Sequence, residues 1–525
     1  MTRPAVAATA LAFMLAGCAR SGGGEPAEPH VLRIADNVDP SSLNPLLAHD
    51  QDTIGYDLLV TQTLVGLSAE NRLVPVLVTR VPSQANGDIS RDGRTIVYRL
   101  RHRVRFADGT ELTSADVAFT FRAILDPRNP VESQDAYRRV ESLQTPNRYT
   151  VVVRLQRRWN AAVAELFAQA DFAFGILPAH AFASTDVTRA AWNERPFGTG
   201  PFKVVEWERA SRIVLEPNPY YRPRPRLHRI VFAMIPTRQA ALLALQTRAI
   251  DVAEIDATLV RQARSVAGAR VVTTPINGLD MLLLQSAAPP TGDLHVRRAI
   301  AAATDRTELT RALLGTVTPA DSFVPPVLAW HDPDPRAIVA GSSAVVRELS
   351  GDGWRKNGEF WTKAGNRLSV TIVFPAVMPA PVLEQEQLRH AGIEAWIKPY
   401  TATLFNAPGG PLRSGNFTIA EAEWIGGADP EQSVIFACSQ RGSDGNNSMN
   451  YCSAPFDARF ADQATTSDPL RRRRDFIEMQ RIVRRDVPAV PLYFESEIDI
   501  VRDRVSGFRR NMLMYPVGAE EWDTR

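Results

Sequence analysis

The sequence has almost no net charge, and it has no long apolar run beyond its first residues. Lysine and arginine number 60 and aspartate and glutamate 58, which gives a net charge of +2. The basic excess that indicates nucleic-acid binding is therefore missing, and we expect no nucleic-acid partner. The only basic cluster, at 471–474, lies in a helical pattern and predicts a solvated helix face. After residue 17, no stretch approaches the about 20 apolar residues of a membrane span.

The motifs of common catalytic sites are also missing. The chain has no H-E-x-x-H, C-x-x-C, G-x-S-x-G, P-loop or G-x-G-x-x-G motif, and its 8 histidines are scattered. The Gly-Thr-Gly at 198–200 precedes a strand pattern rather than a helix, which favours a tight turn over a phosphate site. We expect no enzyme activity, no cofactor and no metal. A secreted enzyme whose catalytic groups come from scattered residues remains a less favoured alternative.

The N-terminus predicts export and a lipid anchor. Residues 5–17 are apolar apart from Thr9, which is the length of a signal-peptide core and too short for a membrane span. The following Leu-Ala-Gly-Cys ends at Cys18 and resembles the bacterial lipobox, in which the cysteine is lipidated. An ordinary signal peptide with an incidental cysteine is the alternative. We predict a lipoprotein signal peptide at 1–18, a flexible tether at 19–30, and a protein anchored on the periplasmic or cell-surface side of a bacterial membrane.

The chain has 3 cysteines, an odd number. If Cys18 carries lipid, Cys438 and Cys452 remain as a pair in an oxidising compartment. They flank "SQRGSDGNNSMNY", a loop rich in Gly, Asn and Ser with little to pack. We predict a disulfide between them, with two free buried thiols as the alternative.

Strand and helix patterns alternate along the chain, which predicts an α/β protein. Residues 94–126 combine strand-like alternation with a capping-box-like helix start at Thr113 and Asp116. Residues 53–67 carry a helical pattern, and 293–315 predict two helices with a break between them. A chain of 525 residues is too long for one hydrophobic core, so two or three lobes are expected.

Six sequence blocks, in this order and behind the lipobox, resemble a known family. They are "SRDGRTIVYRLRHRVRFADGTELTSADVAFTF", "FGTGPFKVVEW", "ALLALQTRAIDVAEI", "VRRAIAAATDRTELTRALLG", "CSQRGSDGNNSMNYCSAPFDARF" and "MQRIVRRDVPAVPLYF". The chain resembles the peptide- and nickel-type extracellular solute-binding proteins of ABC importers (family 5), the oligopeptide- and dipeptide-binding proteins among them. The resemblance implies a periplasmic-binding-protein-like fold of class II, with two hinged lobes that enclose the ligand and an extra lobe. It implies a discontinuous lobe I at 31–66, 190–280 and 491–525, an extra lobe II at 67–189, and a lobe III at 281–490.

The resemblance also implies a ligand site. In the peptide binders a tryptophan is followed, three residues later, by an aspartate that pairs with the ligand's terminal amine. In "EAEWIGGADPEQSV", Trp424 takes the aromatic position and Gly427 the aspartate position, while Asp429 matches the Asp-Pro that follows. Asn446 matches a family asparagine near the ligand. The implied ligand-binding residues are Trp424, Gly426, Gly427, Asp429, Asn446, His49, Asp50 and Gln51. The alternatives are a core aromatic for Trp424, a loop-capping Asn446 and a solvated loop at 49–51.

What the resemblance implies for function is binding rather than catalysis. Ligand contacts from both lobes stabilise a closed state, which the ABC permease subunits in the membrane then recognise. We expect a monomer that binds a peptide or peptide-like small solute. Because Gly427 removes the family aspartate, a free α-amine would need Asp429 or a carboxylate of another lobe. A sugar, an amino-acid conjugate or a metal chelate is therefore the alternative ligand, and sensing is an alternative to transport.

Overall fold

The computed structural model describes residues 28–47, 51–131, 133–170, 173–182, 186–334, 340–378, 380–442, 445–466 and 468–525. The side chains at 51–54, 431 and 432 are not part of this description. Cys18, His49, Asp50 and the side chain of Gln51 therefore lie outside the described residues. Within the described ranges, no helix is both long enough and apolar enough to cross a membrane.

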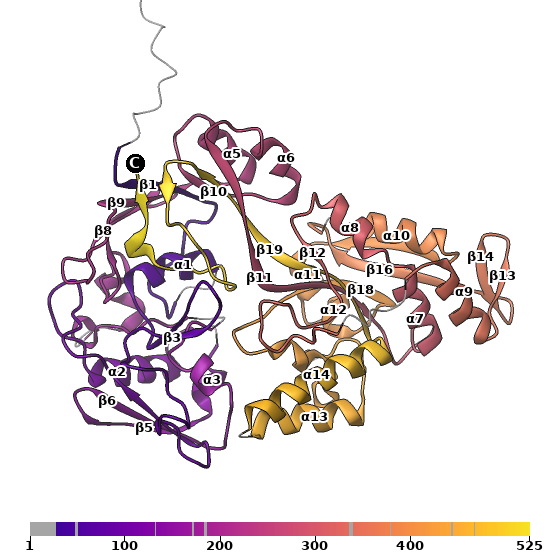
Figure 1. Ribbon diagram of the computed structural model, residues 1–525, viewed down its shortest axis with the longest axis horizontal. Coiled ribbons are helices and arrows are strands. Elements are labelled where there is room, and N and C mark those ends of the chain that lie inside the picture. Colours follow the sequence, from indigo (N-terminus) through magenta and orange to yellow (C-terminus); the bar gives the residue numbers. More distant parts are fainter. Residues whose placement is uncertain are drawn as a thin grey trace, which may run out of the picture.

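Two long antiparallel strands, β11 (Ala269–Leu284) and β19 (Ala489–Arg502), run diagonally through the molecule and connect its two halves (Figure 1). Their pairing slips between Pro275 and Leu279, where β11 carries residues that have no single partner on β19. A proline has no N–H to donate to the ladder, so Pro275 suits such an interruption. β11 is only partly buried before this point and fully buried after it. The two strands are the only continuous sheet between the halves among the described residues.

The half of the sheet beside β19 is built from both ends of the chain. β1 lies between two parallel neighbours, β9 and β10, and α5 carries the chain from β9 to β10 across β1. The strand order from β19 outward is β10-β1-β9-β8-β7. The elements are β1 (Val31–Asp36), α1 (Gln51–Val60), β7 (Phe202–Glu208), β8 (Arg212–Pro217), β9 (Arg229–Met234), α5 (Arg238–Gln246), β10 (Val252–Glu254), α6 (Val260–Ala263), β20 (Val505–Ser506) and β21 (Asp523–Thr524). We call this part the terminal half.

The half beside β11 is built from the middle of the chain, with strand order β11-β18-β16-β17. Helices α13 and α14 cover one face and α7, α9 and α10 cover the other, because the side chains of β11 and β18 alternate between two separate hydrophobic clusters. The elements are α7 (Leu294–Ala303), α8 (Arg306–Ala312), β12 (Thr318–Pro319), α9 (Ser342–Gly351), β13 (Arg355–Asn357), β14 (Phe360–Lys363), β15 (Asn366–Arg367), β16 (Ser369–Pro375), α10 (Pro381–His390), β17 (Glu394–Tyr400), α11 (Ala402–Asn406), α12 (Pro411–Ser414), β18 (Ile419–Ile425), α13 (Ala454–Thr465) and α14 (Pro469–Asp486). We call this part the central half.

A smaller sheet, of order β4-β6-β5, has its own hydrophobic core. It lies on the same side of the molecule as the terminal half, and α3 faces α13 and α14 across the gap (Figure 1). The elements are β2 (Val65–Leu67), β3 (Leu73–Pro75), β4 (Thr95–Arg99), α2 (Ser114–Leu125), α3 (Asp135–Arg138), β5 (Val140–Asn147), β6 (Thr150–Leu155) and α4 (Ala162–Glu165). We call this part the small region.

The α/β class predicted from the sequence is confirmed, and so are several local signals. Thr113 caps α2 with a complete capping box that includes Asp116, and the expected break at 293–315 separates α7 from α8. The helix predicted over 53–67 is wrong at its C-terminal end. The helix stops at Val60, since the next residues pair with other segments: Leu64 N–H donates to Phe167 O at 2.7 Å, and β2 pairs with β3.

Candidate functional site

A cavity of about 550 Å³ lies between the small region and the central half. One wall comes from segments around α3 and α4, and the other from the end of β18, the loop after it, α13 and α14. Such a volume lies within the range of small-molecule and cofactor sites, about 300–1,000 Å³. We call it the interlobe cavity. Three of the residues predicted from the sequence line it, namely Trp424, Asp429 and Asn446.

Trp424 lies near the end of β18 and is half-buried at the cavity. Its indole Nε1 is buried and donates no hydrogen bond to any described residue. Buried tryptophan N–H groups usually find an acceptor, so this donor is available to a ligand with an exposed oxygen.

Gly426 and Gly427 are buried but do not line the interlobe cavity. The N–H of Gly426 donates to Asn277 O at 2.9 Å, and the carbonyl oxygen of Gly427 accepts from Asn277 Nδ2 at 2.6 Å. Asn277 lies in the interrupted part of β11. The two glycines thus attach the end of β18 to the crossing strand, with one backbone group of each occupied there.

Asp429 forms a bidentate ion pair with Arg472 of α14, with distances of 2.7 and 2.8 Å. The side chains are 13% and 11% exposed, so the pair is nearly buried. Arg472 also donates to the side-chain oxygen of Gln463 at 3.2 Å and lies 4.7 Å from the ring centre of Trp330. The charge of Asp429 is therefore balanced by a fixed guanidinium group, unlike that of a carboxylate open to a ligand amine.

This contact corrects one prediction from the sequence. The basic cluster at 471–474 was expected to be a solvated face, but only three of its arginines are exposed, whereas Arg472 is buried. Arg472 shares its helix face with Phe476 and Met479, which are buried in the hydrophobic core of the central half. A run of four arginines cannot all point to one side of a helix, and the spacing of the apolar residues selects which one turns inward.

Asn446 is exposed and lines the cavity, whereas its neighbour Asn447 is fully buried. Asn447 Nδ2 donates to Ala437 O at 3.0 Å and to Tyr451 O at 2.8 Å, so it holds the loop together. The predicted disulfide between Cys438 and Cys452 is present, with the two Cα atoms 4.6 Å apart. The disulfide and Asn447 together fix the backbone that carries Asn446.

The opposite wall contributes residues that the sequence did not single out. The guanidinium of Arg139 lies 4.7 Å from the ring centre of Trp159, and the carboxyl groups of Asp135 and Glu165 also line the cavity. These residues come from separate short elements, so no sequence motif groups them. Their chemistry allows contacts with both charged ends of a zwitterionic ligand.

Asn160 joins the two walls directly. Its side-chain Nδ2 donates to Gln463 O and to Thr466 O, each at 2.8 Å, across the cavity's edge. Both acceptors lie in the last turn and C-cap of α13, where carbonyl groups have no partner within the helix. One amide therefore links the small region to the central half.

A second group of carboxyl side chains is buried between the sheet and the helices α7, α9 and α10 that cover one of its faces. Asp280 of β11, Glu421 of β18 and Glu384 of α10 are each at most 1% exposed. Asp280 Oδ2 accepts a hydrogen bond from the hydroxyl of Tyr493 at 2.8 Å, but Asp280 Oδ1 and both carboxyl oxygens of Glu384 and of Glu421 have no described partner.

The protonation of these groups follows from their burial. Burial raises the pKa of Glu384 to about 8. Burial raises the pKa of Asp280 and of Glu421 well above the ordinary range, and the neighbouring carboxyl groups add to both rises. They are therefore neutral acids at physiological pH rather than a charged cluster.

Comparison with known proteins identifies the class to which this fold and cavity belong. The family model of bacterial extracellular solute-binding proteins, family 5 (middle), matches residues 72–446. The chain therefore belongs to the family 5 bacterial extracellular solute-binding proteins, as the resemblance in its sequence implied, and its fold is theirs.

Individual relatives share the whole length of the chain. Protein XP55 of Streptomyces lividans is 25% identical, over 96% of this chain and 92% of that protein. The oligopeptide-binding protein AppA of Bacillus subtilis is 23% identical over 98% of this chain and 96% of its own, and its structure with a nonapeptide superposes with a TM-score of 0.72. The structure of NikA from Brucella suis in complex with Fe(III)-EDTA has a TM-score of 0.81 at 20% identity, covering 94% of this chain and 100% of that one.

Proposed function

We propose that the protein is the lipid-anchored substrate-binding component of an ABC importer. It binds a peptide or peptide-like solute in the interlobe cavity, closes around it by a hinge movement, and delivers it to a membrane permease. It acts as a monomer, on the periplasmic or cell-surface side of a bacterial membrane, and performs no catalysis. The observation that carries the proposal is a ligand-sized cavity whose walls come from two separate parts of the molecule, the small region and the central half.

The hinge lies in the crossing strands. The pairing of the two strands shifts between Pro275 and Leu279 and again between Asp280 and Met281, and we place the bend at the longer of these interruptions, between Pro275 and Leu279. We divide the chain accordingly into a lobe I at 31–66, 190–280 and 491–525, an extra lobe II at 67–189 and a lobe III at 281–490. A ligand that contacts both walls of the cavity favours the closed state, because those contacts exist only when the lobes meet.

The ligand class follows from the charges of the cavity. Trp424 offers an N–H donor, and Asn446 offers an amide that can bind a peptide backbone. Among the sequence-predicted residues, the only carboxylate with a described side chain is that of Asp429, which Arg472 already balances. We therefore assign capture of a ligand's amine to the opposite wall, where Glu165 and Asp135 lie. His49, Asp50 and Gln51 remain predicted contacts of the same ligand.

A second candidate is a non-peptide solute, such as a sugar, an amino-acid conjugate or a metal chelate. The observation that favours it is the replacement of the family aspartate by Gly427, whose backbone is tied to Asn277 and brings no charge to the cavity. Structures with both kinds of bound molecule share the fold, namely AppA with a nonapeptide and NikA with Fe(III)-EDTA.

Native mass spectrometry of the chain purified without its signal segment tests both candidates. A ladder of short peptides released on denaturation would support the peptide assignment, and Glu165→Gln should then reduce the fraction of protein that retains them. A single non-peptide mass would establish the second candidate instead. Protein that releases nothing, and that shows no change in shape with peptides or chelates, would contradict both.

The lipid anchor has its own test. A Cys18→Ser form should leave the membrane fraction and accumulate in solution, since no other segment of the sequence is long enough to hold it there. Membrane association that survives this substitution would disprove the anchor and leave the binding function untouched.

A further inference from the structure

A second cavity lies within the terminal half and shares no lining residue with the interlobe cavity. It measures about 80 Å³, well below the volumes that hold whole peptides or cofactors. A single water takes about 30 Å³ in the liquid, so the space suits one small chemical group. We call it the terminal cavity.

The terminal cavity lies at the carboxyl ends of three neighbouring parallel strands. Asp36 ends β1, Glu254 ends β10, and Ile235 follows directly after β9, and all three line the cavity. The chain crosses over β1 between β9 and β10, so the connections diverge at this edge of the sheet. In open α/β sheets, ligands bind in the crevice that such diverging connections leave.

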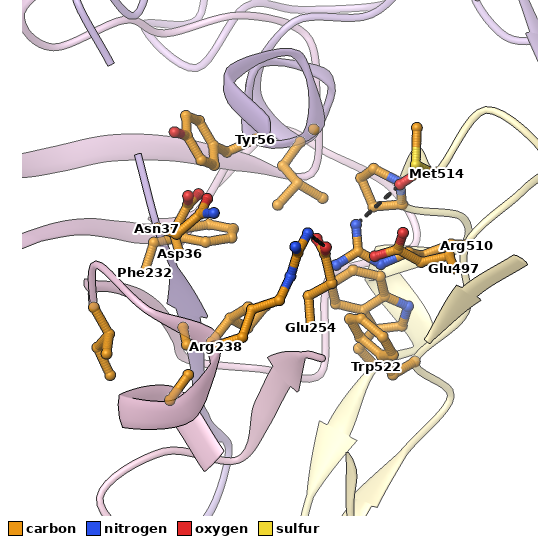
Figure 2. A pocket seen from close by; sticks show the side chains of 18 residues that line it. Asp36, Asn37, Tyr56, Phe232, Arg238, Glu254, Glu497, Arg510, Met514 and Trp522 are labelled. Carbon is orange, nitrogen blue, oxygen red and sulfur yellow. Dashed lines mark hydrogen bonds and ion pairs between the residues drawn. The ribbon is translucent and has the colours of Figure 1, made fainter. Parts of the chain in front are cut away.

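Acidic groups outnumber basic ones around this cavity. Arg238 forms an ion pair with Glu254, and Arg510 forms one with Asp499 at 3.2 Å. Figure 2 shows Asp36, Asn37 and Phe232 on one side, Glu497, Arg510 and Trp522 on the other, and the Arg238–Glu254 pair between them. Three carboxyl groups, those of Asp36, Glu254 and Glu497, line the cavity together with two guanidinium groups, those of Arg238 and Arg510. The excess favours a cation as occupant.

Glu497 is the carboxyl group of the terminal cavity that a bound cation would contact. The side chain comes from β19 and its residue is only 8% exposed, and its Oε1 is buried and accepts no hydrogen bond from any described residue. Burial raises the pKa of Glu497 well above its ordinary value against the attraction of Arg510, and Glu254 and Asp499 add to the rise. Without an occupant, the buried oxygen is satisfied best by a proton; a bound cation replaces that proton.

The remaining walls are aromatic, which selects the kind of cation. Tyr56, Phe232, Phe508 and Trp522 line the cavity, and aromatic faces attract organic ammonium groups. Among the described residues, Cys438, Cys452 and Asp457 are the only group of three or more side chains close enough together to hold one metal ion, and none of them lines this cavity. The carboxyl groups here are thus too far apart to form a metal site, but they surround a space that an ammonium group fills.

We propose that the terminal cavity is a second ligand site, which binds a small primary alkylammonium group against Glu497 and its aromatic walls. Arg238 lines the cavity and its side chain is 43% exposed. The site is built on one half of the sheet and does not depend on closure of the interlobe cavity. Its occupant is therefore an effector or a second, smaller solute rather than the cargo of the interlobe cavity.

Isothermal titration calorimetry of the purified full chain with propylammonium chloride tests this site, with potassium chloride at equal ionic strength as reference. We expect saturable binding of propylammonium, with protons released to the buffer and no equivalent signal from potassium. The isosteric Glu497→Gln form should bind at least tenfold more weakly, whereas Glu386→Gln, at an exposed residue of α10 that lines neither cavity, should bind like the natural chain.

Three outcomes would overturn the proposal: no saturable heat, equal binding of potassium, or binding that survives Glu497→Gln. Loss of propylammonium binding in Glu165→Gln alone would place the amine in the interlobe cavity instead. Because Glu497→Gln should still retain whatever ligand the interlobe cavity releases in native mass spectrometry, failure of this site is distinguishable from failure of the transport function. Retention of that ligand also shows that the variant is folded.

Discussion

The carboxyl group of Asp429 at the interlobe cavity and those buried between the sheet and its helices are stabilised in opposite ways. At the cavity, Asp429 forms an ion pair with the nearly buried Arg472. Behind it, Asp280, Glu384 and Glu421 have no basic partner among the described residues, and burial raises the pKa of each, which favours the neutral acid. Asp429 and the three buried acids all belong to the central half, but they lie on different segments and in different surroundings.

A carboxyl group that is removed from water is therefore stable in two states, paired with a cation or protonated. Removal of a charged or acidic group should therefore change the free energy of unfolding in opposite directions in the two regions. At the cavity, loss of one partner leaves an uncompensated charge. Inside the sheet, replacement of an acid by its neutral isostere removes a group that is costly to ionise.

The largest expected effect comes from Arg472→Ala. It leaves Asp429 nearly buried without its counter-charge, and we expect the free energy of unfolding to fall by about 3–5 kcal/mol. Urea denaturation followed by circular dichroism measures it. Arg471→Ala on the same helix is the matched control, because Arg471 is 51% exposed and pairs with an exposed aspartate; its loss should cost less than about 1 kcal/mol. Equal effects of the two substitutions would refute the buried pair.

The pH dependence of stability probes the other region. Because the pKa of Glu384 is about 8 when folded and near its ordinary value when unfolded, the folded state binds more protons between these values. The sign is therefore a loss of stability as the pH rises from 5 to 8. Glu384→Gln should flatten this dependence by roughly 3 kcal/mol over that range.

The test compares how much the free energy of unfolding changes between pH 5 and pH 8, since a buried amide alters stability by itself at every pH. Glu386→Gln is the matched control, on the same helix but exposed, and it should leave the pH dependence unchanged. A Glu384→Gln profile as steep as that of the natural chain would show that this carboxyl group is not held neutral by burial.

The sequence predicts the fold far better than it predicts the cavity. Capping boxes, turn signals and strand alternation act locally, so Thr113 and the two helices at 293–315 are read directly from their own neighbourhoods. Where the structure departs from these signals, as at the end of α1, the cause is pairing with segments remote in sequence.

The cavity depends on such remote contacts throughout. Trp424 and Asn446 were found because family motifs carry them, and both line the interlobe cavity. Arg472 was missed since its run of arginines resembles a solvated face, and only the packing of α14 turns it towards Asp429. The opposite wall gave no signal, because Trp159, Asn160 and Glu165 acquire their meaning from a partner wall some 300 residues away in sequence, as the contact of Asn160 with Gln463 illustrates.

Loss of the disulfide beside the interlobe cavity should have a smaller and more local effect on stability. Closing a loop of this length stabilises a protein by about 2–3 kcal/mol in the chain-entropy model. The double substitution Cys438→Ser and Cys452→Ser should lower the free energy of unfolding by that amount, and should loosen the segment that carries Asn446. Thiol labelling of the natural chain after denaturation without reductant checks the bond itself; two labelled cysteines would show that it is not formed.

The smallest effect on stability, and the most specific one on function, is expected from Asn160→Asp. An aspartate of the same shape accepts but cannot donate, so both hydrogen bonds to the end of α13 are lost and its charge faces carbonyl oxygens. Each wall keeps its own core, and the free energy of unfolding should change by less than about 1 kcal/mol.

Closure of the interlobe cavity should be weakened more, because this contact exists only when the walls meet. We expect about a tenfold weaker retention of the interlobe ligand in native mass spectrometry, which corresponds to about 1.4 kcal/mol. Exposed Asn366, on the central half and away from the interlobe cavity, supplies the control Asn366→Asp. Retention that is equal in the two variants would mean that Asn160 only caps α13 and has no part in holding the lobes closed.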